Sequence, residues 1–154
     1  MNSIHFHLIT NHFPIIVPVI ALMVMFGGFL IRSEMIKRTA LALFVFGALS
    51  TFPAMYSGDK AEDLVDKIPG ITHDMIEIHE KSAEQFAFWH YGLGLLALMA
   101  LLSSWKNHKT SQILTILVIV FAFAIIYLGN HTATSGGEIR HTEIRIGYEP
   151  EPIR

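Results

Sequence analysis

The sequence contains no cysteine among its 154 residues. The chain therefore forms no disulfide, binds no metal through thiolate sulfur and has no CxxCH motif for covalent attachment of a c-type haem. It also lacks the HExxH, GxSxG and glycine-rich phosphate-loop motifs, so neither a hydrolase nor a nucleotide-binding protein finds support. The net charge is −2 and no basic run is present, so no nucleic-acid partner is expected.

Charged residues make up only 16% of the chain, whereas 52% of its residues are hydrophobic. Lysine, arginine, aspartate and glutamate are all missing from four windows, at residues 13–31, 39–58, 85–105 and 110–130. Each window has about the 20 residues that a helix needs to cross a bilayer core of roughly 30 Å. The sequence therefore predicts an all-α integral membrane four-helix bundle over residues 1–146, followed by an extended tail over 147–154.

The short connections between the windows indicate an orientation. Their basic residues are Arg32, Lys37, Arg38, Lys106 and Lys109. Short loops rich in lysine and arginine mark the cytoplasmic side, so both termini are expected to face the periplasm, with the protein in a bacterial inner membrane. We expect residues 59–84 to form a long outer loop that holds a short helix near 59–67. From about Thr72 the chain is expected to be a helix that continues into the third window.

Histidine is abundant and unevenly placed. Of the nine histidines, eight lie on the predicted outer side or in its half of the membrane: His5, His7, His12, His73, His79, His90, His131 and His141. Imidazole binds metals, binds haem and transfers protons, so this distribution indicates a site near the outer face. The alternative is that polar outer segments have collected histidines by chance.

His90 is the strongest single candidate. It lies five residues inside the third window, and an ionisable residue at that depth is expected to face the bundle interior and to have a partner there. Gly94 lies on the same helical face, where the missing side chain would let a flat group approach the backbone. The alternative is a hydrogen bond from His90 to a backbone carbonyl, with the glycine serving close helix packing.

The positions of four further histidines indicate what each can do. His79 precedes His90 by eleven residues and shares its face, but a separation of roughly 16 Å is too long for one metal ion. His79 would then belong to a second cofactor or to a surface site. His12 is expected near the start of the first membrane helix, at the outer surface. His5 and His7 alternate with apolar residues as on an extended or surface-lying segment, and they receive no role.

The segment HTATSGGEIRHTE, residues 131–143, follows the fourth window. His131 ends the membrane helix, and the small residues after it predict a flexible link that bends back over the bundle. His141 would then approach the other histidines, and Arg140 would meet a ligand carboxylate at the rim. The alternative is a frayed helix end with a polar tail.

Imidazoles from several helices of one bundle fit two kinds of site. One or two haem b groups would each have iron between two imidazoles and propionates at the aqueous rim, near Arg140 or Lys81. A Cu or Zn site would need three or four imidazoles around one ion. The candidate ligands of such an ion are His12, His90, His131 and His141.

Several segments together resemble a bacterial family of small four-helix membrane proteins of unknown function. They are HFPI, GALSTFPAMYSGDKAED, a histidine early in the third window and GGEIRH, and the resemblance covers most of the chain. Some members of that family are fused to c-type cytochrome modules, which implies periplasmic electron transfer. The resemblance picks out His12, His90, Gly136, Gly137 and His141.

The leading hypothesis is a b-type cytochrome that binds non-covalent haem near the outer face and transfers electrons between the quinone pool and periplasmic carriers. It would be an electron-transfer protein or subunit rather than a stand-alone enzyme. The expected partners are the lipid bilayer, quinone, and a periplasmic c-type cytochrome or respiratory-complex subunits, and a homo-oligomer is left open. The alternatives are a non-haem Cu or Zn protein and a cofactor-free accessory subunit of a larger respiratory complex.

Overall fold

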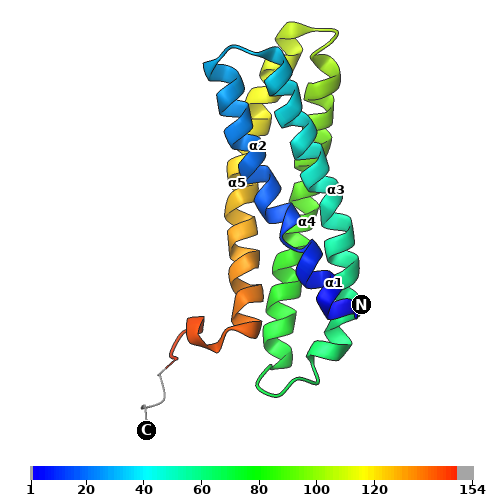
Figure 1. Ribbon diagram of the computed structural model, residues 1–154, viewed down its shortest axis with the longest axis vertical. Helices are drawn as coiled ribbons and strands as arrows, with labels where there is room; N and C mark the ends of the chain where they lie inside the picture. Colours follow the sequence, from blue (N-terminus) through cyan, green and yellow to red (C-terminus); the bar gives the residue numbers. More distant parts are fainter. Residues whose placement is uncertain (1, 149–154) are drawn as a thin grey trace.

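Residues 2–148, which the structure describes, form five α-helices and one short 3-10 helix in this computed structural model (Figure 1). The elements are α1 (Ser3–Thr10), α2 (Phe13–Leu30), α3 (Glu34–Val65), α4 (His73–Ser103), α5 (His108–Arg140) and η1 (Thr142–Ile144). Four helical segments are long and apolar enough to cross a membrane, with α1 and α2 together counted as the first. The predicted all-α fold with four membrane-length helices is confirmed.

Helices α2 to α5 run up and down, each beside the next, and α2 also contacts α5, which closes the ring. The α2–α3 and α4–α5 connections lie at one end of the bundle, at the top of Figure 1. We call this the basic end, because Arg32, Lys37, Arg38 and Lys106 lie on or beside these connections. The opposite end holds α1, the α3–α4 connection and the C-terminal end of α5, and we call it the histidine end.

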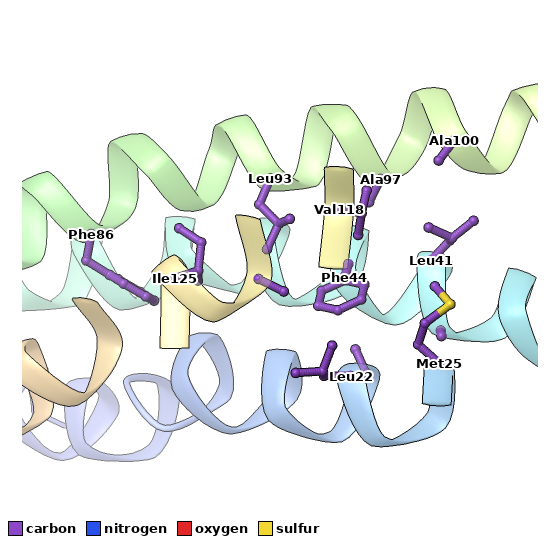
Figure 2. Close-up of a cluster of buried hydrophobic side chains, with 13 residues drawn as sticks. Leu22, Met25, Leu41, Phe44, Phe86, Leu93, Ala97, Ala100, Val118 and Ile125 are labelled. Carbon is purple, nitrogen blue, oxygen red and sulfur yellow. The ribbon is translucent and has the colours of Figure 1, made fainter. Parts of the chain in front are cut away.

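The middle and the basic half of the bundle are closely packed. Figure 2 shows side chains from facing helices meeting between them, among them Phe44 of α3, Leu93 of α4 and Ile125 of α5, all completely buried. A Cβ atom added at Gly94 would lie 2.4 Å from Cβ of Ala48. The space beside Gly94 is therefore filled by α3, which leaves no room there for a flat group.

The connection between α3 and α4 is short, contrary to the predicted long outer loop. Helix α3 continues to Val65 and α4 begins at His73, so only residues 66–72 connect them. Residues 59–65 extend α3 and do not start a separate helix, because no glycine or proline interrupts the chain between Gly58 and Pro69. The connection contains Gly70 at φ +85°, a left-handed conformation that suits glycine. The predicted start of α4 after Thr72 is confirmed.

Residues 132–137 do not form the predicted flexible link. Helix α5 continues through Gly136 and Gly137 to Arg140, and His141 follows as its C-cap. Tertiary contacts override the weak helix preference of these small residues, since Ser135 and Gly136 both contact His79 of α4. The chain turns only after the helix, in η1. The tail predicted over 147–154 lies largely outside the described residues.

The first residues form helix α1, where an extended or surface-lying segment was expected. The Asn2 side chain accepts a hydrogen bond from the His5 backbone N–H, which caps the helix. Residues 11 and 12 then join α1 to α2, and His12 is the N-cap of α2, as predicted. Helix α1 packs on α3 (Figure 1), and this contact places one face of α1 toward the bundle.

Candidate functional site

A cavity of about 630 Å³ lies at the histidine end. It arises there because α1 follows α3 rather than continuing α2 along α5. Its walls are largely apolar and come from all five α-helices, for example Ile15, Met55, Ile76 and Phe86. Its polar lining residues include His7, His12, His79, His141, Arg140, Asp59, Glu62 and Glu80. The cavity therefore combines apolar walls with several imidazoles and both signs of charge.

His7 lines the cavity from α1 and is held by α3. Its Nδ1 lies 3.0 Å from the carbonyl oxygen of Ala54 and 3.2 Å from Oγ of Ser57. Because a carbonyl oxygen only accepts hydrogen bonds, Nδ1 carries the proton and Nε2 keeps its lone pair. A Cβ atom at Gly58 would come within 3.3 Å of the His7 ring. Ser57 thus helps to orient the imidazole, and Gly58 leaves room for it.

His79 lines the same cavity from α4 and is held by α5 in a matching way. Its Nδ1 lies 3.0 Å from Oγ of Ser135, whose hydroxyl donates to the carbonyl of Thr132. The Ser135 oxygen therefore accepts from His79, so Nδ1 again carries the proton and Nε2 keeps its lone pair. A Cβ atom at Gly136 would lie only 2.8 Å from the His79 ring. The Ser135–Gly136 pair repeats the arrangement of Ser57–Gly58.

His90 lies below the floor of the cavity. Its side chain is 0% exposed, and Nδ1 lies 2.9 Å from Oγ1 of Thr51. The Phe86 ring centre is 5.0 Å from that of His90. Thr51 and Phe86 line the cavity whereas His90 does not. The predicted interior position of His90 is confirmed, but its partner is a hydroxyl on α3 instead of a backbone carbonyl. Its Nε2 is buried and meets no hydrogen-bond partner within the described part of the chain.

His12 and His141 lie at the edge of the cavity and are exposed. Nδ1 of His12 donates to the Leu8 carbonyl at 2.9 Å, which leaves its Nε2 lone pair free as well. Nδ1 of His141 lies 2.9 Å from Oε1 of Glu143. The pKa of Glu143 is held below its usual value by its own backbone N–H and by the hydrogen bond from His141. Arg140 is exposed and also lines the cavity.

The other predicted site residues lie elsewhere. His131 is exposed on α5, and its Nδ1 contacts Oγ of Ser82 at 3.0 Å. Lys81 forms an exposed ion pair with Glu77. Across residues 2–148 no group of three or more histidine, aspartate or glutamate side chains is placed to hold a metal ion. The described residues therefore give no support to a Cu or Zn site that joins His12, His90, His131 and His141.

His7 is the site residue that the sequence analysis missed. An eight-residue helix carries too little periodicity to distinguish it from an extended segment. One signal was available, because a Ser–Gly dipeptide occurs in YSGD at 57–58 and again in TSGG at 135–136. Ser57–Gly58 contacts His7, and Ser135–Gly136 contacts His79.

Comparison with models of protein families, with curated proteins and with solved structures finds no match to this chain. The resemblance to the family of small four-helix membrane proteins therefore stays a prediction. The cavity and its residues are the features of this chain that bear on function.

Replacing Thr51 by valine should destabilise the protein by about 1–3 kcal/mol, because both nitrogens of the buried His90 ring then lack a partner. The measurement is denaturant unfolding of the purified protein in detergent. Thr39→Val is the matched control, since the exposed Thr39 hydroxyl bonds to the Met35 carbonyl of its own helix. In a His90→Phe background the cost of Thr51→Val should fall. Equal costs for the two threonine variants would contradict this account of His90.

Proposed function

We propose that the protein is a membrane-bound b-type cytochrome with its haem in the cavity at the histidine end. His7 and His79 would hold the haem in this proposal. One observation supports this proposal most strongly. Two cavity imidazoles from different helices each donate Nδ1–H to a fixed acceptor and keep the Nε2 lone pair. A metal-bound histidine commonly has this arrangement, in which the second ring nitrogen donates to the protein and fixes the tautomer.

The cavity suits a flat, largely apolar group. Its volume of about 630 Å³ falls within the range of small-molecule and cofactor sites. Gly58 and Gly136 lie directly against the two imidazoles, where any side chain would displace the rings. Because each ring is fixed by both a hydrogen bond and a packing contact, the two Nε2 atoms are held ready for a ligand.

Charge at the cavity edge suggests how the haem would be oriented. Asp59, Glu62 and Glu80 come from α3 and α4, whereas Arg140 and His141 come from the end of α5. Haem propionates carry negative charge, so they would lie toward Arg140, which can donate two hydrogen bonds to one carboxylate. Bound haem iron supplies reversible one-electron transfer.

His90 is outside the ligand pair in this proposal, although the sequence favoured it. Its ring is enclosed below the cavity, and its Nδ1 supports Thr51 at the cavity floor. Its place there fits a structural role beneath the cofactor.

The proposal includes an orientation and a cellular setting. The basic end would face the cytoplasm of a bacterial inner membrane, since its short connections carry lysine and arginine. The histidine end would then face the periplasm, where the haem would transfer electrons between the quinone pool and a carrier such as a c-type cytochrome.

Loss of either proposed ligand should remove six-coordinate haem. His7→Ala and His79→Ala should each abolish the low-spin absorption spectrum when haem is titrated into the purified protein. His5→Ala is the control, because His5 is exposed on the same short helix as His7. If both alanine variants kept the wild-type spectrum, the ligand assignment would be wrong.

Ser135, which accepts the hydrogen bond from His79, should contribute to haem affinity. Ser135→Ala removes the acceptor of the His79 Nδ1–H bond, so haem affinity should fall by about 10- to 100-fold, as is usual when such a partner of a ligating histidine is lost. Thr134→Ala is the matched control, since the exposed Thr134 hydroxyl bonds to the Asn130 carbonyl of its own helix and Thr134 does not line the cavity. Ser135→Thr should restore much of the affinity. An equal loss in Thr134→Ala would argue against His79 as a ligand.

A further inference from the structure

A second, smaller pocket lies at the basic end, far from the histidine cavity. Its volume is about 190 Å³, and it lies where the ends of α2, α3, α4 and α5 meet. Its polar lining comprises Glu34, Lys37, Arg38, Ser104, Ser111, Gln112 and Thr115. Phe29, Leu41 and Ile116 form its apolar part. The proposed function assigns no role to this pocket.

Arg38 is fixed in place beside this pocket. Its Nε donates to Oγ of Ser104 at 2.9 Å, and Nη2 donates to the Ser104 carbonyl at 2.8 Å. The guanidinium carbon lies 4.9 Å from the centre of the Trp105 ring. A guanidinium has five N–H donors, so three remain, and these three meet no acceptor among the described residues. A half-buried, immobilised cation with spare donors is suited to phosphate oxygens.

The surroundings of Arg38 favour an anion. Lys37 lines the pocket with only 16% of its side chain exposed, and it forms an ion pair with Glu34. Two cations against one carboxylate leave the lining with a positive charge. Helices α3 and α5 begin at this end and α2 and α4 finish there, so their dipoles largely cancel and the positive charge comes from the side chains. The Thr115 hydroxyl also lines the pocket, whereas the Ser111 hydroxyl already donates to the Ala100 carbonyl at 3.4 Å.

The phosphate could belong to a free phosphate ion or to a phospholipid headgroup, and the apolar lining of the pocket favours the headgroup. Phe29 and Ile116 line the pocket and are also 43% and 58% exposed on the outer face of membrane-length helices. An acyl chain can continue from the pocket along these side chains, whereas a free phosphate ion gains nothing from them. We propose that this pocket binds the headgroup phosphate of an anionic phospholipid through Arg38, with the acyl chains lying against Phe29 and Ile116. Basic pockets between membrane helices are known places for such headgroups.

Trp105 provides a local reporter, since it contacts Arg38 and only one other tryptophan, Trp89, is present. The Trp89→Phe protein is reconstituted into phosphatidylcholine vesicles that contain a minority of brominated phosphatidylglycerol, or the same fraction of brominated phosphatidylcholine. The bromine atoms quench tryptophan emission on contact. Brominated phosphatidylglycerol should quench Trp105 more strongly than brominated phosphatidylcholine. Arg38→Gln should reduce the apparent affinity for phosphatidylglycerol roughly fivefold, the effect of one cation near an anionic lipid.

Lys106→Gln is the charge-matched control, because Lys106 is exposed at the same end and does not line the pocket. It should keep most of the preference for phosphatidylglycerol. Thr115→Leu fills the pocket from α5 while keeping the arginine at position 38, and it should also remove the preference, which tests the site if Arg38→Gln fails to fold. Equal quenching by the two lipids in the parent protein would overturn the proposal. If the two lipids quench equally while millimolar inorganic phosphate changes the Trp105 emission, the ligand is the free ion and not the lipid.

Discussion

A histidine ring that is shielded from water between helices needs hydrogen-bond partners on the helices around it. This constraint governs the histidine end of the molecule. His7 on α1 bonds to α3, His79 on α4 bonds to α5, and His90 on α4 bonds to α3. The three hydrogen bonds thus connect α1, α3, α4 and α5. By bonding one nitrogen of each imidazole, the bundle also fixes the helices that surround the cavity.

The two halves of the bundle differ in how closely their helices are packed. Toward the basic end, Gly94 and Ala48 bring α3 and α4 so close that the core is filled by side chains. Toward the histidine end, α1 turns onto α3, and the space it leaves remains as the cavity. A closely packed half gives a rigid base for a hollow half, which is what a cofactor site requires if its ligands are to keep their geometry.

The sequence predicted the parts of the fold that depend on length and composition. Four charge-free windows were enough to identify the membrane-length helices, and the depth of His90 in its window predicted a buried side chain. The helix ends were harder, because α3 and α5 extend beyond their windows through polar residues. Gly136 illustrates the difficulty: a small residue after a membrane helix suggests a flexible link, whereas its actual contact is with His79, 57 positions earlier in the chain. Pairings such as Thr51 with His90 depend on the register between helices, which no local pattern contains.

The central claim is that the cavity at the histidine end holds haem b between two imidazoles. The most direct measurement is the reduced-minus-oxidised absorption spectrum of the wild-type protein purified from membranes in mild detergent. The proposal predicts a Soret band and sharp reduced α and β bands of six-coordinate haem, in a fixed ratio to the protein. A protein that is purified folded but colourless, and that stays so when haem is added, would contradict it.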